Sequence, residues 1–291
     1  MGVKTYQIDR IWEDLKQIGI SIKIEHTIFS LPFIFIGMVV AAGGWFGWKF
    51  LLLGVIAGFS ARTFGMMVNR LVDREIDRLN PRTATRPTAN GLVSVWEMVG
   101  IIGISGVIFI VTTYFANPLA FKLSFPILGI LAGYSFTKRF TPFSHLFLGI
   151  ALGLAPIAGA ILVTGTVPPW SVFLGFGVMF WVAGFDVLYS IQDIRFDQQE
   201  GLFSIPALVG TEGALLFSRL FHLLALLFWG WFTFFARLGI WGWAGVGVVA
   251  LILIWEQKLV AQDFQNIPRA FFDLNALLGM VYFGFIVLNY L

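Results

Sequence analysis

The sequence predicts an all-α integral membrane protein, built as a single bundle of nine transmembrane helices. Of its 291 residues, 58% are hydrophobic and only 12% are charged, whereas soluble domains carry roughly 25% charged residues. The mean hydropathy is +0.86. Apolar runs of about 20 residues, the length that a spanning helix needs, recur along the chain. The alternation of a membrane β-barrel is absent, and helices are the other structure that satisfies backbone polar groups in lipid.

Nine apolar stretches qualify as spanning helices, and we expect them to pack into one domain that covers residues 1–291. The polar, amphipathic segment 1–20 lacks the short apolar core and the cleavage site of a signal peptide, so we expect it at the cytoplasmic interface. No soluble appendage is long enough to fold alone. The predicted spans are roughly residues 22–42, 50–70, 95–116, 119–136, 143–164, 170–190, 212–235, 238–257 and 270–290.

Lysine and arginine lie mostly on one side of these spans. With the N-terminus inside, fourteen of them fall in inside segments and three, Lys49, Lys122 and Arg237, in outside segments. Cytoplasmic loops carry an excess of these residues. The pattern therefore predicts a protein of the inner (plasma) membrane with a cytoplasmic N-terminus and a C-terminus on the far side. The long polar connections 70–94 and 191–211 then both face the cytoplasm.

Composition excludes several chemistries. The chain has no cysteine, which excludes disulfides, thiolate catalysis and cysteine-ligated metals. The formal net charge is only +3 and no basic block occurs, so we expect no nucleic-acid partner. The composition instead indicates the lipid bilayer as the environment of the protein.

A charged stretch, NRLVDREIDRLNPRTATRP at residues 69–87, directly follows the second predicted span. Charge near a bilayer core is costly and usually functional. Asn69, Asp73 and Asp77 are four residues apart, so on a helix they form one face. The alternative is that these acids are solvated at a helix end or paired with the neighbouring arginines.

A second acidic cluster, FDVLYSIQDIRFDQQEG, follows the sixth predicted span, four spans later, and this spacing hints at a duplication. Asp186, Asp193 and Asp197 are spaced i, i+7 and i+11, which returns to nearly the same helical angle. Tyr189 lies at the edge of that face. Aligned like charges repel unless a cation or a proton offsets them, so two such clusters favour a cation site. Oxygen ligands without cysteine or histidine suit a hard cation, Mg²⁺ first.

Basic residues accompany both clusters on the same side of the membrane. Mg²⁺ is typically held by one or two carboxylates together with substrate phosphates. Carboxylates and cations in one site therefore predict a polyanion bridged by metal, and diphosphate fits, with arginine and lysine neutralising its further oxygens. Positive-inside topology alone would also place arginines here. The residues are Arg74, Arg78, Arg82, Arg86, Lys138, Arg139 and Arg195.

With these motifs the chain resembles the UbiA-type membrane prenyltransferases. The first motif is NxxxDxxxD at 69–77, followed by NPRTATRP, and the second is YSxQDxxxD at 189–197, with Asp186 just before it. A third element, YSFTKR at 134–139, resembles the Tyr…Lys-Arg stretch of the family. The resemblance covers the whole chain and implies a central cavity that opens to the cytoplasmic side and laterally to lipid.

The resemblance implies Mg²⁺-dependent transfer of a prenyl group from a polyprenyl diphosphate to an acceptor, usually aromatic. Asp186 matches an acid found ahead of the second motif in members that act on aromatic acids, and with the motif aspartates it is a candidate catalytic residue. The implied ligands of Mg²⁺ and diphosphate are Asn69, Asp73, Asp77, Asp193 and Asp197. The implied contacts to diphosphate oxygens come from Lys138, Arg139, Arg74, Arg82 and Arg86.

The implied reaction begins when the C–O bond of the diphosphate breaks and leaves an allylic cation. Aromatic faces stabilise such a cation, and we assign this role to Tyr134 and Tyr189. Water must also be kept away from the cation. The motif wording is most similar to bacterial quinone-pathway members, whose acceptors are 4-hydroxybenzoate or a related aromatic acid, including a dihydroxynaphthoate of the menaquinone route. Lys23 and Arg62 are candidates to bind the acceptor carboxylate, and His26 to accept the phenolic proton.

Several alternatives stay open. Lys23 could snorkel at the interface, Arg62 could pair with an acid of the same cavity, and His26 could be a satisfied interfacial residue. The acceptor could be haem, a chlorophyll precursor or a glycerol phosphate lipid. A cation transporter is the alternative of another class, but it requires charges at the bilayer midplane, and the arginines here would repel a passing cation. His145 and His222 have no neighbours that indicate a site, and we interpret both as packing residues.

Overall fold

The computed structural model describes residues 13, 16–22 and 27–291, with the backbone alone at 27–30. Lys23, His26 and most of the segment 1–20 lie outside this description, so the predictions for them stay predictions. Over the described part the chain is all-α, and eight of its helices are long and apolar enough to cross a membrane. The first predicted span corresponds to a shorter apolar helix, Leu31–Ala42.

The long helices follow the predicted apolar runs, and the third begins and ends at the predicted residues. In chain order they are α2 (Thr27–Ala42), α3 (Trp48–Val72), α5 (Val95–Ala116), α6 (Pro118–Gly133), α7 (Ser144–Thr164), α8 (Pro169–Ser190), α10 (Ile205–Phe235), α11 (Ile240–Gln262) and α13 (Asn275–Leu288). Short helices lie between them: α4 (Arg74–Leu79), η2 (Tyr134–Arg139), η3 (Ile191–Asp193), α9 (Ile194–Glu200), η4 (Phe264–Asn266), α12 (Ile267–Arg269) and η5 (Ala270–Leu274).

Helix α10 departs from the prediction because it begins seven residues earlier, at Ile205. The Ser204 hydroxyl accepts a hydrogen bond from the Ala207 N–H at 3.2 Å and caps the helix. The helical conformation is then interrupted at Gly210, with φ 70° and ψ −175°, a conformation that glycine adopts without steric cost. The prediction of a loop over 191–211 is therefore wrong in extent, because capping and a glycine break set these boundaries rather than apolar length.

Local signals explain where α5 and α6 begin. Ser94 accepts from the Glu97 N–H at 3.2 Å while the Glu97 carboxylate accepts from the Ser94 N–H at 2.7 Å, which is a capping box. Asn117 accepts from the Ala120 N–H at 2.9 Å. Pro118 then occupies the start of α6, where its missing N–H leaves no hydrogen bond unmade.

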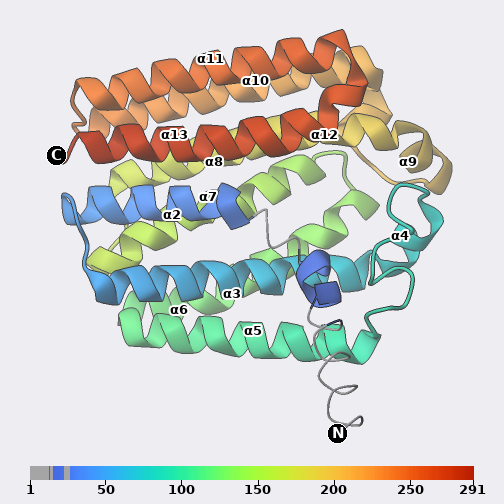
Figure 1. The fold of residues 1–291 in the computed structure, drawn as a ribbon, viewed down its shortest axis with the longest axis horizontal. Coiled ribbons are helices and arrows are strands. Elements are labelled where there is room, and N and C mark those ends of the chain that lie inside the picture. The colour runs from blue at the N-terminus through green and yellow to red at the C-terminus, as the bar shows by residue number, and fades with distance from the viewer. Residues whose placement is uncertain (1–12, 14–15, 23–26) are drawn as a thin grey trace, which may run out of the picture.

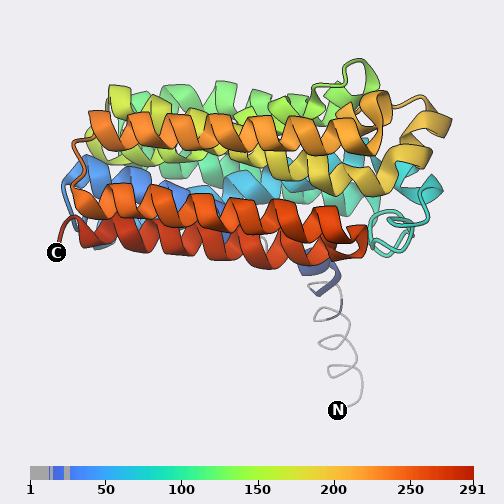
Figure 2. The ribbon, with the colours of Figure 1, turned by 90° about the horizontal axis from the view of Figure 1, so that it is seen from above.

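The long helices run side by side in one bundle (Figures 1 and 2). Helices α8, α10, α11 and α13 form one side and α3, α5 and α6 the other, with α2 and α7 between them (Figure 1). Helix α8 packs against α7 and α10, α2 against α7 and α13, and α3 against α5. The short helices α4 and α9 lie at the same end of the bundle, opposite the C-terminus. The two acidic segments, far apart in sequence, therefore meet at one end.

Aromatic side chains fill the centre between α2, α8, α10 and α13. Phe33 is 1% exposed, and Trp181, Trp229 and Tyr282 are fully buried. The Phe33 ring centroid lies 5.0 Å from that of Trp181 and 5.8 Å from that of Trp229. Such pairs contribute about 0.5–1.5 kcal/mol each beyond their burial. The cluster holds α8, the helix that carries the second acidic motif, in a fixed place.

Helix α7 approaches its neighbours through glycines. A Cβ at Gly159 would overlap the carbonyl oxygen of Ile34 on α2, and one at Gly149 would overlap that of Met179 on α8. Small residues let membrane helices pack closely, which is a main source of their association in lipid. These two glycines therefore fix α7, a wall of the site described below, between α2 and α8.

Replacing Gly149 with valine should destabilise the fold by about 1–3 kcal/mol, because the new side chain must push α7 away from α8. Gly129→Val on α6 is the matched control, since a Cβ there meets nothing within 4 Å. Thermal unfolding of the two purified variants in detergent measures the difference. Equal melting temperatures would contradict the role assigned to the close approach.

Candidate active site

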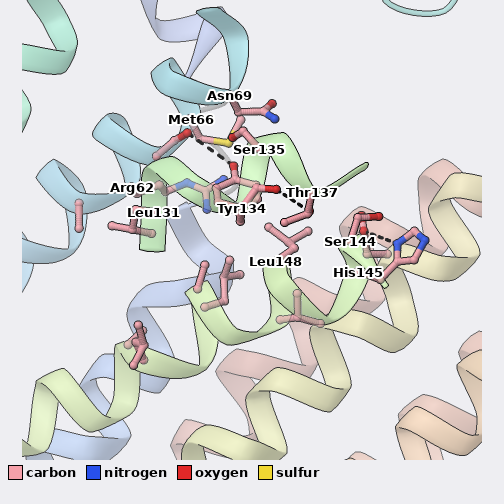
Figure 3. Close-up of a pocket in the computed structure, with 18 of the residues that line it drawn as sticks. Arg62, Met66, Asn69, Leu131, Tyr134, Ser135, Thr137, Ser144, His145 and Leu148 are labelled. Atoms are coloured by element: carbon pink, nitrogen blue, oxygen red, sulfur yellow. Dashed lines mark hydrogen bonds and ion pairs between the residues drawn. The ribbon is translucent and has the colours of Figure 1, made fainter. Parts of the chain in front are cut away.

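A cavity of about 430 Å³ lies inside the bundle, with charged residues at the end that carries α4 and α9 and apolar residues of α3, α6 and α7 along the rest. Figure 3 shows part of its wall. The five predicted aspartates line it: Asp73, Asp77, Asp186, Asp193 and Asp197. The two acidic motifs therefore share one cavity.

Asp73 lies where α3 ends and α4 begins, and it is 4% exposed. Its carboxylate accepts hydrogen bonds from Lys138 Nζ at 2.7 Å, Arg139 Nη2 at 3.1 Å and Asn69 Nδ2 at 2.9 Å. Arg139 Nη2 also donates to the Val72 carbonyl at 2.8 Å. The two cations of η2 thus neutralise the first aspartate of the first motif.

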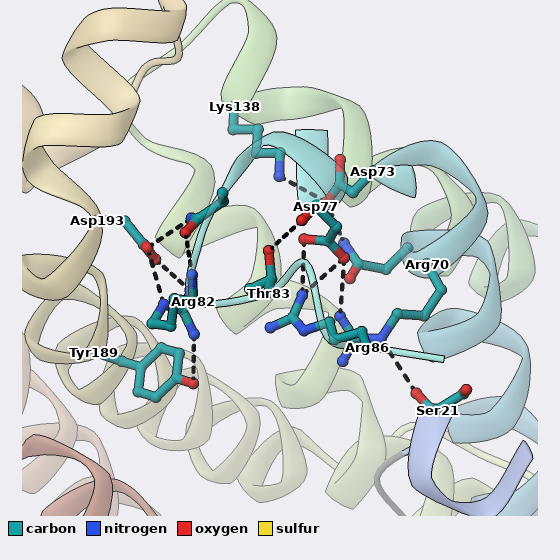
Figure 4. Close-up of polar contacts among 12 residues, drawn as sticks. Ser21, Arg70, Asp73, Asp77, Arg82, Thr83, Arg86, Lys138, Tyr189 and Asp193 are labelled. Atoms are coloured by element: carbon teal, nitrogen blue, oxygen red, sulfur yellow. Dashed lines mark hydrogen bonds and ion pairs between the residues drawn. The ribbon is translucent and has the colours of Figure 1, made fainter. Parts of the chain in front are cut away.

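Asp77, on α4, is 5% exposed and also bound by cations. Arg86 Nη1 donates to both carboxylate oxygens, at 2.9 and 2.8 Å, and Arg70 Nη1 lies 3.7 Å from Oδ2. Arg70 is itself buried, and its Nε donates to the Ser21 carbonyl at 3.2 Å (Figure 4). The Thr83 hydroxyl donates to the Asp77 carbonyl at 3.0 Å and holds the turn after α4 against that helix.

Asp193 receives its partners from the turn that follows the first motif (Figure 4). Arg82 donates through Nε to Oδ1 at 2.9 Å and through Nη2 to Oδ2 at 2.5 Å, and Asn80 Nδ2 donates to Oδ1 at 2.9 Å. Arg82 Nη1 also donates to the Tyr189 hydroxyl at 2.9 Å. Burial lowers the pKa of Arg82, but the hydrogen bond to Asp193 and the nearby charges outweigh it and raise the pKa above its ordinary value. One guanidinium therefore joins the turn after the first motif to the second motif.

Asp197 has a hydroxyl partner instead of a cation. Ser204 Oγ donates to its Oδ2 at 2.8 Å, and the same serine caps α10. The adjacent Phe203 N–H donates to the Lys138 carbonyl at 2.8 Å. The segment after α9 therefore ties the second motif to η2, whose lysine binds the first.

The two motifs share a backbone conformation. Asp73 has φ −93° and ψ 4° before α4, and Asp193 has φ −103° and ψ 2° before α9. This bridge region is sparsely populated, and at both places it interrupts the helix and starts a short new one. Asn69 therefore lies on α3, which ends at Val72, and Asp77 lies on α4, so the helix that carries these residues is interrupted at Asp73.

The other predicted residues divide into two groups. The residues that line the cavity are Tyr134, Tyr189, Arg62, Asn69, Arg82, Arg86 and Lys138. Within this wall, Arg62 lies beside Tyr134 (Figure 3). Arg74 and Arg139 are not among the described residues that line it. Arg74 Nε donates to the Thr88 carbonyl at 3.2 Å and holds the loop after α4, and Arg139 acts on the cavity through Asp73.

Sequence analysis considered Arg70 only among the arginines that could pair with the acids, and it missed Asn80 and His145. His145, interpreted as a packing residue, is 2% exposed and lines the cavity, and its Nδ1 lies 2.7 Å from Asp186 Oδ2. That interpretation was wrong because the partner lies 41 residues along the chain, where no spacing rule applies. Its position could have indicated a role in the site, since His145 lies near the start of the fifth predicted span, at the end that carries the acidic motifs. His222 is buried and does not line this cavity.

The donor set suits a divalent ion that is shared with phosphates. Among the described side chains, no three acids or histidines converge closely enough to hold a metal alone, since cations, amides and hydroxyls bind the motif carboxylates. Mg²⁺ requires only one or two carboxylates and completes its shell with water and phosphate oxygens. Carboxylate oxygens with an amide nearby, as at Asp73 and Asn69, are donors of the type that this ion prefers.

The comparisons with known proteins agree with this geometry. The model of the UbiA prenyltransferase family matches residues 30–282. A 4-hydroxybenzoate octaprenyltransferase of Methylobacillus flagellatus is 30% identical over 284 residues, which cover 94% of this chain and 90% of that protein. Another, of Shewanella woodyi, is 32% identical over 233 residues, covering 77% of this chain and 78% of that protein.

Solved structures have the same fold. A UbiA homolog from Aeropyrum pernix K1 in its apo form has a TM-score of 0.84 and 35% identity, covering 92% of this chain and 99% of that one. A UbiA homolog from Archaeoglobus fulgidus bound to GPP and Mg²⁺ has a TM-score of 0.71 at 19% identity, covering 93% of this chain and 99% of that one. The protein is thus a multi-pass membrane enzyme, and it belongs to the UbiA prenyltransferase family.

Proposed function

We propose that this enzyme transfers a prenyl group from a polyprenyl diphosphate to a hydroxylated aromatic acid, with Mg²⁺, in quinone biosynthesis. 4-Hydroxybenzoate is the acceptor we favour. The observation that carries the proposal is that both acidic motifs and the cations Lys138, Arg82 and Arg86 line one cavity whose wall along α3, α6 and α7 is mostly apolar. The names of the bacterial relatives support the acceptor, and the GPP and Mg²⁺ of the A. fulgidus homolog support the donor and the ion.

The oxygen donors of the two motifs would hold the metal. When bound, Mg²⁺ would neutralise the charge that develops on the leaving diphosphate. The protein supplies carboxylates that line one cavity, and basic residues bind three of them, Asp73, Asp77 and Asp193. The proposed ligands are Asn69, Asp73, Asp77, Asp193 and Asp197.

Lys138, Arg82 and Arg86 are the residues we assign to the diphosphate oxygens. Each lines the cavity and each neutralises an aspartate there. A bound metal diphosphate would replace these ion pairs, because the carboxylates can bind the metal while the cations bind phosphate oxygens. Arg139 and Arg74 do not line the cavity, so we assign them a supporting role, in binding Asp73 and in holding the loop.

The apolar part of the cavity suits the prenyl chain. Its apolar lining along α6 runs from Ala120 to Leu131, which at ~1.5 Å per residue is about 17 Å. That length is more than half the hydrocarbon thickness of a bilayer, about 30 Å. We propose that the cavity opens to the cytoplasm at its charged end and laterally to lipid, so that a long chain need not be fully enclosed.

Aromatic residues near the charged end would meet the reacting carbon. The Tyr189 ring lies 4.4 Å from the Phe271 ring, and both residues line the cavity beside Tyr134 and the motif aspartates. Their faces can stabilise an allylic cation. Arg62, in the same wall, is the residue we assign to the acceptor carboxylate, because a guanidinium binds a carboxylate through two hydrogen bonds.

A dihydroxynaphthoate of the menaquinone route is the second candidate acceptor, since it carries the same two functional groups. Haem and a glycerol phosphate lipid are further candidates within the family. Lys23 and His26 remain expected contacts of the acceptor. We also propose nine spans, with α2 as the first, a cytoplasmic N-terminus and the charged end of the cavity at the cytoplasmic face.

Asp73→Asn and Asp193→Asn should each slow diphosphate release from geranyl diphosphate roughly 100-fold or more at saturating Mg²⁺, because an amide cannot supply the charge that holds the ion. Thermal unfolding should change little. Glu75→Gln is the matched control, since it removes the same charge from the same segment at a side chain that is 70% exposed. A near-normal rate in either aspartate variant would contradict the metal assignment.

The acceptor is identified by incubating the purified enzyme with geranyl diphosphate, Mg²⁺ and a panel of aromatic acids, followed by mass spectrometry of the products. We expect prenylated 4-hydroxybenzoate, and we expect chelation of Mg²⁺ to abolish it and added Mg²⁺ to restore it. If only dihydroxynaphthoate is prenylated, the enzyme belongs to the menaquinone route instead. Absence of any prenylated arene would refute the proposed acceptor class.

Arg62→Ala should weaken acceptor binding roughly 10- to 100-fold, since a hydrogen bond to a charged group contributes about 1.5–3 kcal/mol. Binding of the prenyl diphosphate should change much less, and Lys23→Ala should behave in the same way. Separate titrations of the two substrates measure the difference, with Arg62→Lys as the variant that keeps the charge. An equal loss for both substrates would assign Arg62 a structural role.

A further inference from the structure

A histidine–aspartate pair connects the wall of the cavity to its interior. His145, in the first turn of α7, is 2% exposed, whereas the side chain of Asp186, in the last turn of α8, is 22% exposed. His145 Nδ1 and Asp186 Oδ2 are 2.7 Å apart. Both residues line the cavity, but only the carboxylate is open enough to reach a bound molecule.

The protonation of His145 follows from its second partner. The backbone N–H of Ile205, at the start of α10, points at His145 Nε2 at 3.3 Å. A backbone N–H can only donate, so Nε2 carries the lone pair and the proton of the neutral imidazole is on Nδ1. His145 therefore donates to Asp186 Oδ2 and holds that carboxylate in a fixed orientation.

The other carboxylate oxygen of Asp186 is available to a ligand. Within the described part of the chain, no protein donor binds Oδ1. Asp186 lies on α8, and Asp193, seven residues later, ends η3. The Tyr189 and Phe271 ring centroids are 4.4 Å apart, and both residues line the cavity with the two aspartates. A free acceptor oxygen in a cavity with aromatic walls suits the hydroxyl group of an aromatic ring.

We propose that Asp186 is the base that binds and deprotonates the hydroxyl group of the aromatic acceptor, and that His145 is the residue that positions it. This inference rests on the proposed function. The hydroxyl proton moves to Asp186 Oδ1, and the ring carbon beside the oxygen forms a C–C bond to the allylic carbon. The C–O bond to diphosphate breaks, and its electron pair leaves with the diphosphate. The proton of that ring carbon then passes to the released diphosphate, and Asp186 returns its proton to the oxygen.

His145 does not touch the acceptor, so its contribution differs from that of a catalytic residue. It supplies a donor to Asp186 Oδ2 and an acceptor to the Ile205 N–H, and a glutamine side chain offers the same two groups. His145→Gln should therefore recover most of the transfer activity that His145→Leu loses. If the His145–Asp186 pair served only to hold α7, α8 and α10 together, both variants would lose stability, and their rates would fall equally with every acceptor.

The test compares Asp186→Asn, His145→Leu and His145→Gln with the wild-type enzyme, using geranyl diphosphate, Mg²⁺ and two acceptors. The acceptors are 4-hydroxybenzoate and 3-fluoro-4-hydroxybenzoate, whose hydroxyl ionises more readily and which keeps one free ring carbon beside it. We expect Asp186→Asn to slow transfer to 4-hydroxybenzoate about 100-fold and to leave prenyl diphosphate binding and thermal unfolding nearly unchanged. With the fluorinated acceptor the deficit should be at least about threefold smaller, because less help is needed to remove the proton.

Three outcomes overturn the proposal while the proposed function stands. These are an Asp186→Asn rate within twofold of wild type, an equal deficit with both acceptors, and a His145→Gln variant that folds but is as slow as His145→Leu. If the wild-type enzyme prenylates neither acceptor nor any member of the aromatic panel, the proposed function fails, and this inference fails with it.

Discussion

The site depends on the neutralisation of buried carboxylates by groups that come from other segments of the chain. Removing an ionised carboxylate from water costs several kcal/mol unless it is paired and hydrogen-bonded. Asp73 obtains its cations from η2, Asp77 from the turn after α4, and Asp193 from that same turn across the cavity. Each pair also links two segments, so the compensation of charge and the assembly of the site are one process.

A rigid scaffold supports this charged end. The aromatic cluster around Trp181 fixes α8, and close glycine contacts fix α7 between α2 and α8. The motif aspartates lie at the ends of these helices and on the short helices α4 and α9, which follow Asp73 and Asp193. Sites built on packed helices are more exact in position than sites on free loops, and here the helix breaks turn the motif residues into the cavity.

Most of the fold was predictable because it follows from local composition. Apolar length fixed the spans, and residues such as Ser94 and Pro118 marked their ends. The parts that sequence analysis missed depend on contacts between distant residues or on backbone geometry. The early start of α10, the break at Asp73 and the pairing of His145 with Asp186 have no periodic pattern in the sequence.

The candidate site was predictable in its residue types and less so in its partners. All five predicted aspartates line the cavity, as do Arg82, Arg86 and Lys138. The aspartates could be predicted because acids aligned at helix ends near the membrane are rare without a function. Arg74 does not line the cavity, because its guanidinium donates to the loop carbonyl of Thr88. Its neighbours in sequence do not predict this contact. Positive-inside topology and ligand binding both place arginines at this face, and only the fold separates them.

The balance of charge inside the cavity has a consequence for loading. Among the described residues that line it, five are acidic, Asp73, Asp77, Asp186, Asp193 and Asp197, and five are basic, Arg62, Arg70, Arg82, Arg86 and Lys138, so the formal charges cancel. A divalent ion entering alone would leave an excess of positive charge in a low-dielectric space, and a bare pyrophosphate would leave an excess of negative charge. Under the proposed function, an ion and a diphosphate entering together would disturb electroneutrality least, so the cavity would bind the salt more readily than either of its components.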